Sequence, residues 1–482
     1  MEELIRSALA AADGPGVALV EVRVVAPDRF LQIAVRDGAA SALTDARRDA
    51  LGVRVRTDRA YGFATTTDLR PGPVRDVARL AVRLARAAGR RAPEPLRVTD
   101  ERGPDRGHYE TPMKRDPFRT DPAMVVDILR SAEAALHVSR EIKSALASFQ
   151  AWDEQKWYAS SGGASFTSRI VHVGAGLTAT AVRGSNLQRR SAPSSHGGNA
   201  AQAGFEFVDG LDLIGRAPGL GQEAVDLLGA PVCPTGPTTL VLGSDQLALQ
   251  VHESVGHAVE LDRIFGSEAG FAGTSWVSSA QIGSLRFGSD LMNVVADATE
   301  PGGLGTFGWD DEGVAAQRTP IVDHGVLVGS LSSRESAARL GLSHSGGTAR
   351  GSGGDRSPIV RMTNVNLEPG DLSLEELLSG VKEGVYLDTN RSWSIDDRRL
   401  NFQFGTEFGR RIVKGEIGPL VRNPIYSGMS PVFWGSMDAL GNSSTRHLWG
   451  LTNCGKGQPI QVMHVGHAAP VARFRNVAVR GG

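Results

Sequence analysis

The sequence predicts an α+β protein, with an N-terminal α+β domain built on an antiparallel sheet and a mainly antiparallel C-terminal β domain. At 482 residues the chain is too long for one compact core. Its 59 glycines, about 12% of the residues against a usual ~7%, fall in short clusters that favour tight turns between strands. Helical spacing of apolar residues is frequent only in the first half. We therefore expect domains at residues 1–230 and 231–482.

The N-terminal domain begins with a helix, several strands and a second helix. Residues 2–12 and 73–89 repeat apolar side chains at helical spacing, whereas the runs between them alternate apolar and polar residues as strands do. Residues 92–121 are polar and rich in proline, which predicts a linker inside this domain. The remaining expected elements are a helix at about 121–137, strands through "IKSALASFQAWDEQKWYAS" and "RIVHVGAGLTATAVR", a mobile loop at 191–203 and a helix at about 209–229.

The C-terminal domain is expected to open with a short strand and one helix. The strand in "PVCPTGPTTLVLGS" leads to Asp245, a plausible helix start, and "QLALQVHESVGHAVE" would form the helix. Almost 200 residues of strand-and-turn pattern follow, and the one clear helical exception is "LSLEELLSGVKEG". The helix would thus lie against a β-rich domain.

Bulk composition narrows the classes of function. The formal net charge of −1 gives no field that would attract nucleic acid or an anionic membrane. The N-terminus lacks the pattern of a signal peptide, and no window reaches the ~18 apolar residues of a membrane span. The two cysteines fit a reducing compartment. We expect a cytoplasmic protein that binds neither nucleic acid nor membrane.

The segment "HESVGH" supplies two histidines and a glutamate, the residue types that zinc hydrolysis needs as ligands and general base. His252 and His257 are five positions apart, so a regular helix would point their side chains roughly 140° apart at about 100° per residue. A π-type bulge would bring residues i and i+5 back to one side, and Gly256 makes such a distortion easy. We therefore predict that this helix is irregular between the two histidines.

Two other interpretations of this segment remain open. Glu253 and His257 are four positions apart and could themselves be the ligand pair, with His252 outside the site. The histidines could also be half-buried structural residues without a metal. Burying two imidazoles and a carboxylate on an apolar segment is costly without partners, so the purely structural interpretation does not displace the metal site.

A zinc site with two histidines needs a third ligand, and Cys454 in "LTNCGKGQP" is the candidate. A turn between asparagine and two glycines would leave its sulfur accessible, and Lys456 could lower the pKa of the thiol. The alternative is that Cys454 is a small buried hydrophobic residue. Cys233, between valine and proline ahead of a strand, has no comparable context, and we interpret it as structural.

Two further groups of polar residues could belong to a site. His464 and His467 in "HVGH" form a rival metal pair, but residues three apart in a strand point to opposite faces. The run Asp310, Asp311 and Glu312 is either a solvated turn or a carboxylate cluster facing the site. The glycine pattern "GLGTFG" leads into a turn and a strand and not a helix, so it does not predict a dinucleotide site.

Several motifs in this order resemble the TldD/PmbA family of metallopeptidases: "HESVGHAVELD", "WDDEG" with "VDHGVLVGSLSSRESAARLG", "RMTNVNLEPGD", "GVYLD" and "NCGKGQP". The resemblance implies Zn²⁺ bound by His252, His257 and Cys454, with Glu253 as general base. It also implies an N-terminal α+β domain and a C-terminal β-barrel-like domain. "HVGH" and the segment 390–397, "NRSWSIDD", depart from the family pattern, which puts substrate choice in doubt.

The resemblance further implies an activity and a partner. Family members hydrolyse short or unfolded peptides in extended form and pair as related subunits, so we expect a TldD-type catalytic subunit in a heterodimer with a TldE/PmbA-like subunit, or a homodimer. A tailoring hydrolase that cleaves an amide or C–N bond in a small peptide-like metabolite is the alternative enzyme. A non-catalytic partner subunit is the alternative from another class, and the retained His252, Glu253, His257 and Cys454 argue against it.

Overall fold

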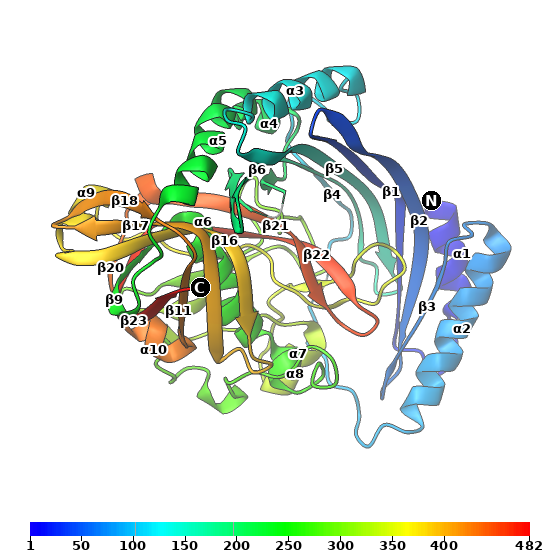
Figure 1. Ribbon diagram of the computed structural model, residues 1–482. Coiled ribbons are helices and arrows are strands. Elements are labelled where there is room, and N and C mark those ends of the chain that lie inside the picture. Colours follow the sequence, from blue (N-terminus) through cyan, green and yellow to red (C-terminus); the bar gives the residue numbers. More distant parts are fainter. Residues whose placement is uncertain (102, 196) are drawn as a thin grey trace.

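The computed structural model describes residues 1–101, 103–195 and 197–482. Its N-terminal half is built on one long, curved sheet in the order β3-β2-β1-β5-β6-β4, with β7 and β8 paired to β6 (Figure 1). All neighbours are antiparallel except β4 and β6. The strands are β1 (Leu19–Arg36), β2 (Ala39–Arg56), β3 (Tyr61–Thr66), β4 (Gly107–Glu110), β5 (Ile142–Ser160), β6 (Ser165–Arg183), β7 (Asn186–Ala192) and β8 (Asn199–Ala201).

Helices cover the convex face of this sheet and leave its concave face toward the C-terminal half (Figure 1). The first two helices share a core with β1, β2 and β3, and helices from residues 122–229 share a second core with β5 and β6. Both cores form because apolar residues recur on one face of each helix. The helices are α1 (Glu2–Ala12), α2 (Pro71–Gly89), α3 (Pro122–Ala135), α4 (Glu206–Gly210) and α5 (Leu213–Gly229).

The C-terminal half contains a closed five-stranded barrel. β16 pairs with β9, β9 with β23, β23 with β19, β19 with β17, and β17 again with β16, which closes the ring. Every pair is antiparallel except β9 and β16. This confirms the expected α+β class with a mainly antiparallel, barrel-like C-terminal half. The strands are β9 (Gly236–Leu242), β16 (Glu383–Ile395), β17 (Asn401–Val413), β19 (Pro424–Met429) and β23 (Ala472–Gly481), with β18 (Glu416–Val421) and β20 (Met437–Leu440) attached.

A two-stranded ribbon, β21 (His447–Lys456) with β22 (Gln461–Ala469), extends from the barrel toward the concave face of the large sheet (Figure 1). It therefore connects the two halves of the molecule. Short strands and helices fill the rest of the C-terminal half: β10 (Val294–Asp297), β11 (Arg318–Asp323), β12 (Val326–Leu327), β13 (Ala349–Arg350), β14 (Ile359–Val360), β15 (Val365–Leu367), α7 (Leu261–Ile264), α8 (Arg334–Leu340), α9 (Leu374–Ser379) and α10 (Ser430–Gly435).

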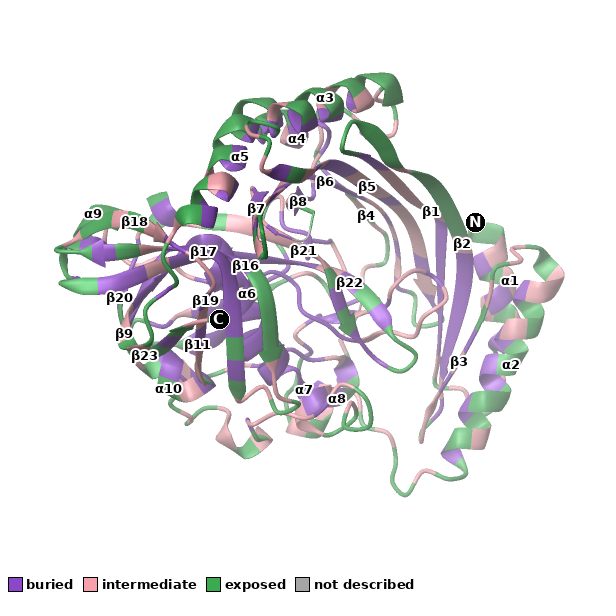
Figure 2. Ribbon diagram, in the orientation of Figure 1, coloured by how far each residue is buried: buried purple, intermediate pink, exposed green. Residues whose placement is uncertain are grey.

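The helix predicted around "HESVGH" is present and is irregular where expected. It starts as α6 (Ser244–Val251), continues as a π-helical turn (His252–Gly256) and ends in a 3₁₀ turn (His257–Val259). All its residues are buried in the C-terminal core, as the purple ribbon of Figure 2 indicates. The prediction of a π-type distortion between the two histidines is confirmed.

Other expectations about elements need correction. "LSLEELLSGVKEG" is not the one helical exception, because α8 and α10 are helices too. The signal for α8 was present in the sequence: Ser333 caps its first turn and Gly341, at φ 84°, ends it. The expected helix at 209–229 is two helices, because the chain turns at Asp212, whose φ is 48°.

The expected linker at 92–121 includes residue 102, and the expected loop at 191–203 includes residue 196. Both of these residues lie outside the described residues. In the described part of 92–121, only residues 107–110 form a strand, β4. The expected loop at 191–203 contains β8, which pairs with β6. Among the described residues, no helix combines the length and the apolar character needed to cross a membrane.

Candidate metal centre

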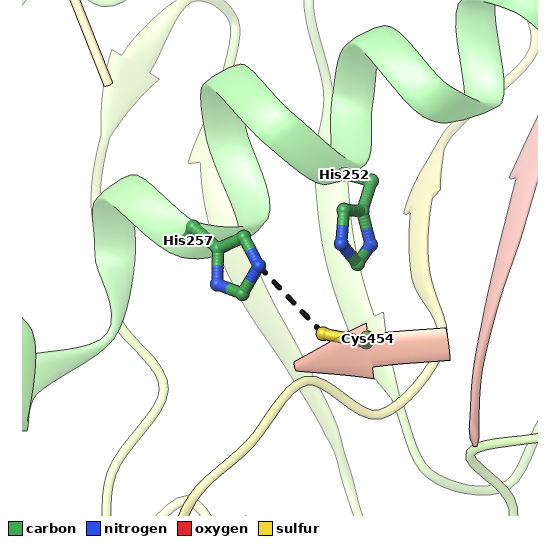
Figure 3. Close-up of side chains that lie close together, drawn as sticks. All are labelled: His252, His257 and Cys454. Carbon is green, nitrogen blue, oxygen red and sulfur yellow. Dashed lines mark hydrogen bonds between the residues drawn. The ribbon is translucent and has the colours of Figure 1, made fainter. Parts of the chain in front are cut away.

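Three potential ligands from distant parts of the chain meet in the C-terminal core. His252 and His257 come from the π-helical turn and its end, and Cys454 comes from β21 (Figure 3). One ligand atom from each residue lies within 4.8 Å of the others, and His257 Nε2 is 3.6 Å from Cys454 Sγ. Zinc bonds of ~2.1 Å to nitrogen and ~2.3 Å to sulfur at tetrahedral angles would separate these two atoms by about 3.6 Å. The donor set therefore fits zinc.

The π-helical turn brings the two histidines to one side. The backbone N–H of His257 donates to the carbonyl of His252, a bond across five residues that widens the turn. The imidazole rings then approach with centroids 4.8 Å apart. Gly256 also has a packing role, because a Cβ at this position would collide with the Met362 sulfur. A glycine is therefore needed there for close packing, whereas its φ of −51° is open to any residue.

A chain of hydrogen bonds orients His252. His467 Nδ1 lies 2.9 Å from the carbonyl oxygen of Val365, and a carbonyl only accepts, so His467 carries its proton on Nδ1. His467 Nε2 must then accept from His252 Nδ1, at 2.8 Å. His252 consequently presents the lone pair of Nε2 to the centre. This is the supporting arrangement that metal-binding histidines generally have.

A buried carboxylate orients His257 in the same way. Its Nδ1 lies 2.9 Å from Glu260 Oε2, so Nδ1 carries the proton and Nε2 faces Cys454 with its lone pair. Glu260 is fully buried and also contacts Arg263 at 3.5 Å and Lys456 at 3.3 Å. Both histidines are thus fixed in the tautomer that a metal requires.

Burial keeps the imidazoles neutral. It lowers the pKa of His252 to about 4 and lowers the pKa values of His257 and His467 well below the ordinary range. Burial alone would raise the pKa of Cys454, but His257 and Arg361 outweigh it and lower that pKa. Neutral imidazoles and an acidic thiol are the forms that bind zinc.

Cys454 differs in two respects from the sequence expectation. It lies in strand β21 and not in an exposed turn, and only 3% of it is exposed. The Lys456 ammonium group bonds Asp262 at 2.7 Å and the carbonyl of Val360 at 2.7 Å, and His257 and Arg361 are the main groups that lower the pKa of the thiol. Cys233 is buried away from the centre, and burial raises the pKa of its thiol to about 11.

Glu253 follows His252 directly and is 6% exposed. Its Oε2 accepts a hydrogen bond of 2.6 Å from Arg399 Nη1. Arg399 sits at the tip of the β16–β17 hairpin with φ 63°, and Asp396 fixes this tip by accepting from the backbone of residues 398, 400 and 401. The general-base candidate therefore has a held, positively charged partner.

The rival residues lie elsewhere or have other roles. His467 supports His252, whereas His464 points away and lies 2.8 Å from His172 of the large sheet, Nδ1 to Nδ1. Two faces of one strand therefore carry the two histidines, as the three-residue spacing indicated. Asp310, Asp311 and Glu312 are buried, so the solvated turn is wrong. Asp311 and Glu312 pair with cations of the large sheet, and Asp310 and Asp311 line a cavity beside that sheet.

Sequence reasoning missed Glu260, Arg399 and the supporting role of His467. Glu260 could have been found, because it follows His257 by three residues and can reach back to its ring. The contacts of Arg399 with Glu253 and of His467 with His252 gave no signal, since they span 146 and 215 residues of the chain.

Models of a known family match most of the chain. The central domain of PmbA/TldA metallopeptidases matches residues 115–230, and their C-terminal domain matches residues 235–481. A metalloprotease of Methanothermobacter thermautotrophicus is 29% identical over 456 residues, 94% of this chain and 93% of the relative. A zinc metalloprotease TldD homolog of Saccharolobus solfataricus is 27% identical over 230 residues, 48% of this chain and 49% of the relative.

Solved structures share the fold over the full length. A Thermotoga maritima protein described as a modulator of DNA gyrase has a TM-score of 0.75 at 17% identity and covers 99% of each chain. TldE from Thermococcus kodakarensis has a TM-score of 0.71 at 16% identity and covers 100% of each chain. At these identities the structural likeness shows the fold alone, and the family rests on the sequence matches. The chain belongs to the TldD/PmbA family of metallopeptidases.

Proposed function

We propose that the chain is a zinc-dependent peptidase, with His252, His257 and Cys454 as ligands and Glu253 as general base. The convergence of the three donor atoms beside a carboxylate carries the proposal. A bound zinc ion would supply a water of lowered pKa and would polarise the scissile carbonyl. Relatives named metalloproteases and a zinc metalloprotease TldD homolog support this chemistry.

The protein's own groups would handle the proton. Glu253 accepts one proton from the attacking water and returns it to the nitrogen of the leaving amine, so that no net proton is lost. Arg399 holds Oε2 of Glu253, which leaves the other carboxylate oxygen, Oε1, to carry the proton. The guanidinium also fixes the carboxylate in one orientation, which a general base needs.

Substrate peptides would be held in extended form along β21. In the described part of the chain this strand pairs only with β22. Asn199 bonds the backbone of Leu448 and Gly450 on the other edge, so residues 451–453, next to Cys454, remain for strand addition. Residues 449–453 and His467 line a groove there. The buried centre favours short or unfolded peptides over folded proteins.

The partner and the location are parts of the same proposal. We propose a TldD-type subunit paired with a TldE/PmbA-like subunit, or a homodimer, in the cytoplasm. The fold shared with TldE supports the pairing, and two free cysteines support a reducing compartment. A peak of about 51 kDa in light scattering, with full peptidase activity, would exclude the dimer.

Two variants test the assignment, because loss of a metal ligand and loss of a general base have different effects on zinc content and on activity. Glu253→Gln keeps size and hydrogen bonding but removes basicity, so zinc should stay at about one per chain while hydrolysis falls by the ~10²–10⁴ typical of a lost general base. Cys454→Ser should lose zinc first, because a serine hydroxyl stays protonated where a thiol ionises. Zinc analysis and hydrolysis of unfolded casein are the measurements.

The opposite result would replace the assignment. If Glu253→Gln lost zinc while Cys454→Ser kept zinc and activity, Glu253 and His257 would be the ligand pair. Casein compared with small aminoacyl conjugates separates a general peptidase from a tailoring hydrolase. A purified chain that binds no zinc would favour the non-catalytic subunit.

A further inference from the structure

A second cavity lies between the concave face of the large sheet and the β21–β22 ribbon. Its volume is about 450 Å³, enough for an amino-acid side chain and its neighbours. Aromatic rings of Phe30, Trp152 and Trp309 form part of its wall, together with the carboxylates of Asp28 and Glu154. Phe30 and Trp152 pack against each other with ring centroids 5.3 Å apart. Aromatic faces and carboxylates together favour a cation.

One carboxylate of this cavity has no direct partner in the protein. Asp28 and Glu154 face each other as register partners on β1 and β5, a placement that is unfavourable for two like charges. Lys156 is shared by Glu154 at 3.1 Å and Asp311 at 2.8 Å. Within the described residues, Asp28 has neither an ion pair nor a hydrogen bond. The Asp28 carboxyl therefore faces the cavity without a direct partner, and burial together with Glu154 raises its pKa to about 7.

A second polar group in the same wall also lacks a partner. His172 and His464 share one hydrogen bond of 2.8 Å between their Nδ1 atoms, so one ring presents a lone pair at Nε2 and the other an N–H. His172 is 7% exposed, and its Nε2 is buried without a hydrogen-bond partner. Burying such an atom is costly unless a ligand satisfies it.

Two cationic side chains, Lys156 and Arg350, also line the cavity, and both already have partners in the protein. Arg350 Nη1 donates to the carbonyl oxygens of Met362 at 2.9 Å and His464 at 3.1 Å, and the guanidinium lies over the Phe307 ring. Arg350 is thus directed at the protein backbone. Within the described residues, Asp28 is the lining carboxylate that has neither a hydrogen bond nor an ion pair.

The cavity adjoins the candidate metal centre through the ribbon. Thr452 lines both this cavity and the groove beside His467, and Met463 in the cavity wall is the register partner of Cys454. A substrate residue in the cavity would therefore lie close in sequence to the bond that is cut. This step rests on the proposed peptidase function.

We propose that the cavity is a subsite for a positively charged group of the substrate: a lysine or arginine side chain, or a free amino terminus. Asp28 and Glu154 accept its hydrogen bonds, the aromatic rings pack against it, and the histidine pair supplies a neutral acceptor. The substrate class is thus peptides with a basic group near the cleaved bond.

Peptide binding to zinc-loaded Glu253→Gln protein tests the subsite without turnover. Calorimetry would compare the acetylated, amidated peptide Ala-Ala-Lys-Ala-Ala with its norleucine, arginine and glutamate counterparts, and with the norleucine peptide carrying a free amino terminus. The lysine peptide should bind about 10- to 100-fold more tightly than the norleucine peptide, the effect expected of a charge-assisted hydrogen bond. The arginine and free-terminus peptides identify which cation is preferred.

Adding Asp28→Asn and Glu154→Gln should bring the ratio of lysine to norleucine affinity close to one. The single change Asp28→Asn breaks no ion pair, so it reports on the subsite even if the double variant does not fold. Asp45→Asn is the matched control, since Asp45 is an exposed carboxylate on the same sheet, paired with Arg29 at 2.6 Å. It should keep the preference.

Equal affinity for the lysine and norleucine peptides, or a lysine preference that survives Asp28→Asn in a folded protein, would overturn the proposal. Failure of the subsite proposal can be distinguished from failure of the proposed peptidase function. If the native zinc-loaded protein cuts no peptide but the Asp28-dependent preference persists, the peptidase assignment fails and the cation subsite stands.

Discussion

At the scale of single residues, the candidate centre depends on which nitrogen of each imidazole carries the proton. Val365 fixes the proton of His467, His467 fixes that of His252, and Glu260 fixes that of His257. None of these partners binds the metal in our proposal. They nevertheless determine whether two lone pairs point at Cys454 or away from it.

His467→Ala should therefore weaken zinc binding although His467 is not a proposed ligand. Loss of such a supporting residue typically reduces metal affinity by about 10- to 100-fold, because the ligand ring can then rotate and change tautomer. Competition with a chromogenic chelator measures the affinity. His464→Ala, three residues away on the opposite face of β22, is the matched control and should bind zinc as the parent does. Equal zinc affinity in both variants would contradict this role of His467.

The residues that the sequence revealed at this centre are those with a local pattern. The spacing of His252 and His257 predicted the distortion between them, because a regular helix would point residues five apart in different directions. Arg399 could not be predicted, since its contact with Glu253 depends on how a hairpin 146 residues away packs on the helix.

Asp28 should make stability depend on pH. Burial, followed by Glu154, raises the pKa of Asp28 from 3.8 to about 7. The folded protein thus keeps a proton that the unfolded chain loses near pH 4, and the contribution of Asp28 to stability falls as pH rises from about 4 to 7. Asp28→Asn removes this penalty, so it should stabilise the protein by about 1–3 kcal/mol at pH 8 and have little effect at pH 4.

Urea unfolding of both proteins at the two pH values measures the difference. Asp45→Asn is again the control with the opposite sign, since its hydrogen bond to Arg29 lowers the pKa of Asp45. A gain for Asp28→Asn that is equal at pH 4 and pH 8 would show that the effect is not a titration of Asp28.

At the scale of elements, the spacing of apolar residues predicts some helices, whereas the closure of the barrel depends on contacts between distant parts of the chain. The helices α1 and α2 follow from apolar spacing alone because each packs one face on the sheet. The barrel does not follow in this way. Its closure requires β16 to pair with both β9 and β17, and β9 precedes β16 by more than a hundred residues. Local alternation cannot specify such a pairing.

The π-helical turn packs closely at Gly256. Substituting this glycine distinguishes the cost of overpacking from the effect of helix propensity on stability. Gly256→Ala would place a methyl group against the fully buried Met362, and overpacking of this kind costs about 1–3 kcal/mol. Because the strain falls between the two histidines, zinc affinity should fall as well. Denaturant unfolding and chelator competition are the two measurements.

Gly219→Ala is the matched helical control. Gly219 lies in α5 with open space around its Cβ position, so the same substitution should stabilise the protein by about 0.5–1 kcal/mol through helix propensity. If Gly256→Ala were as stable as Gly219→Ala and bound zinc normally, the turn would not need a glycine at this position.

At the scale of the whole molecule, buried ion pairs connect the two halves. Asp311 contacts Arg23 of β1 and Lys156 of β5, each at 2.8 Å, and Glu312 contacts Arg54 of β2 at 2.9 Å. The carboxylates belong to the C-terminal half and their cations to the large sheet. The acidic run that the sequence left unexplained therefore positions the concave face of the sheet, and with it the cation cavity, over the ribbon that carries Cys454.

Removal of one member of such a network should cost most where the remaining charges have no other partner. Asp311→Ala leaves Arg23 buried at the interface without another carboxylate among the described residues, whereas Lys156 keeps Glu154 at 3.1 Å. An unpaired buried charge of this kind typically costs about 3–5 kcal/mol of unfolding free energy. Glu312→Ala should cost less, roughly 1–3 kcal/mol, because Arg54 keeps its 2.6 Å contact with Glu21. Asp323→Ala, at an exposed carboxylate of the same half, should stay within about 0.5 kcal/mol of the parent.

Zinc content should be unchanged in all three variants, since none of the three residues contacts the centre. Guanidinium unfolding followed by circular dichroism gives the three values; if Asp311→Ala were no more destabilising than Asp323→Ala, packing of apolar groups and not the buried charges would hold the two halves together.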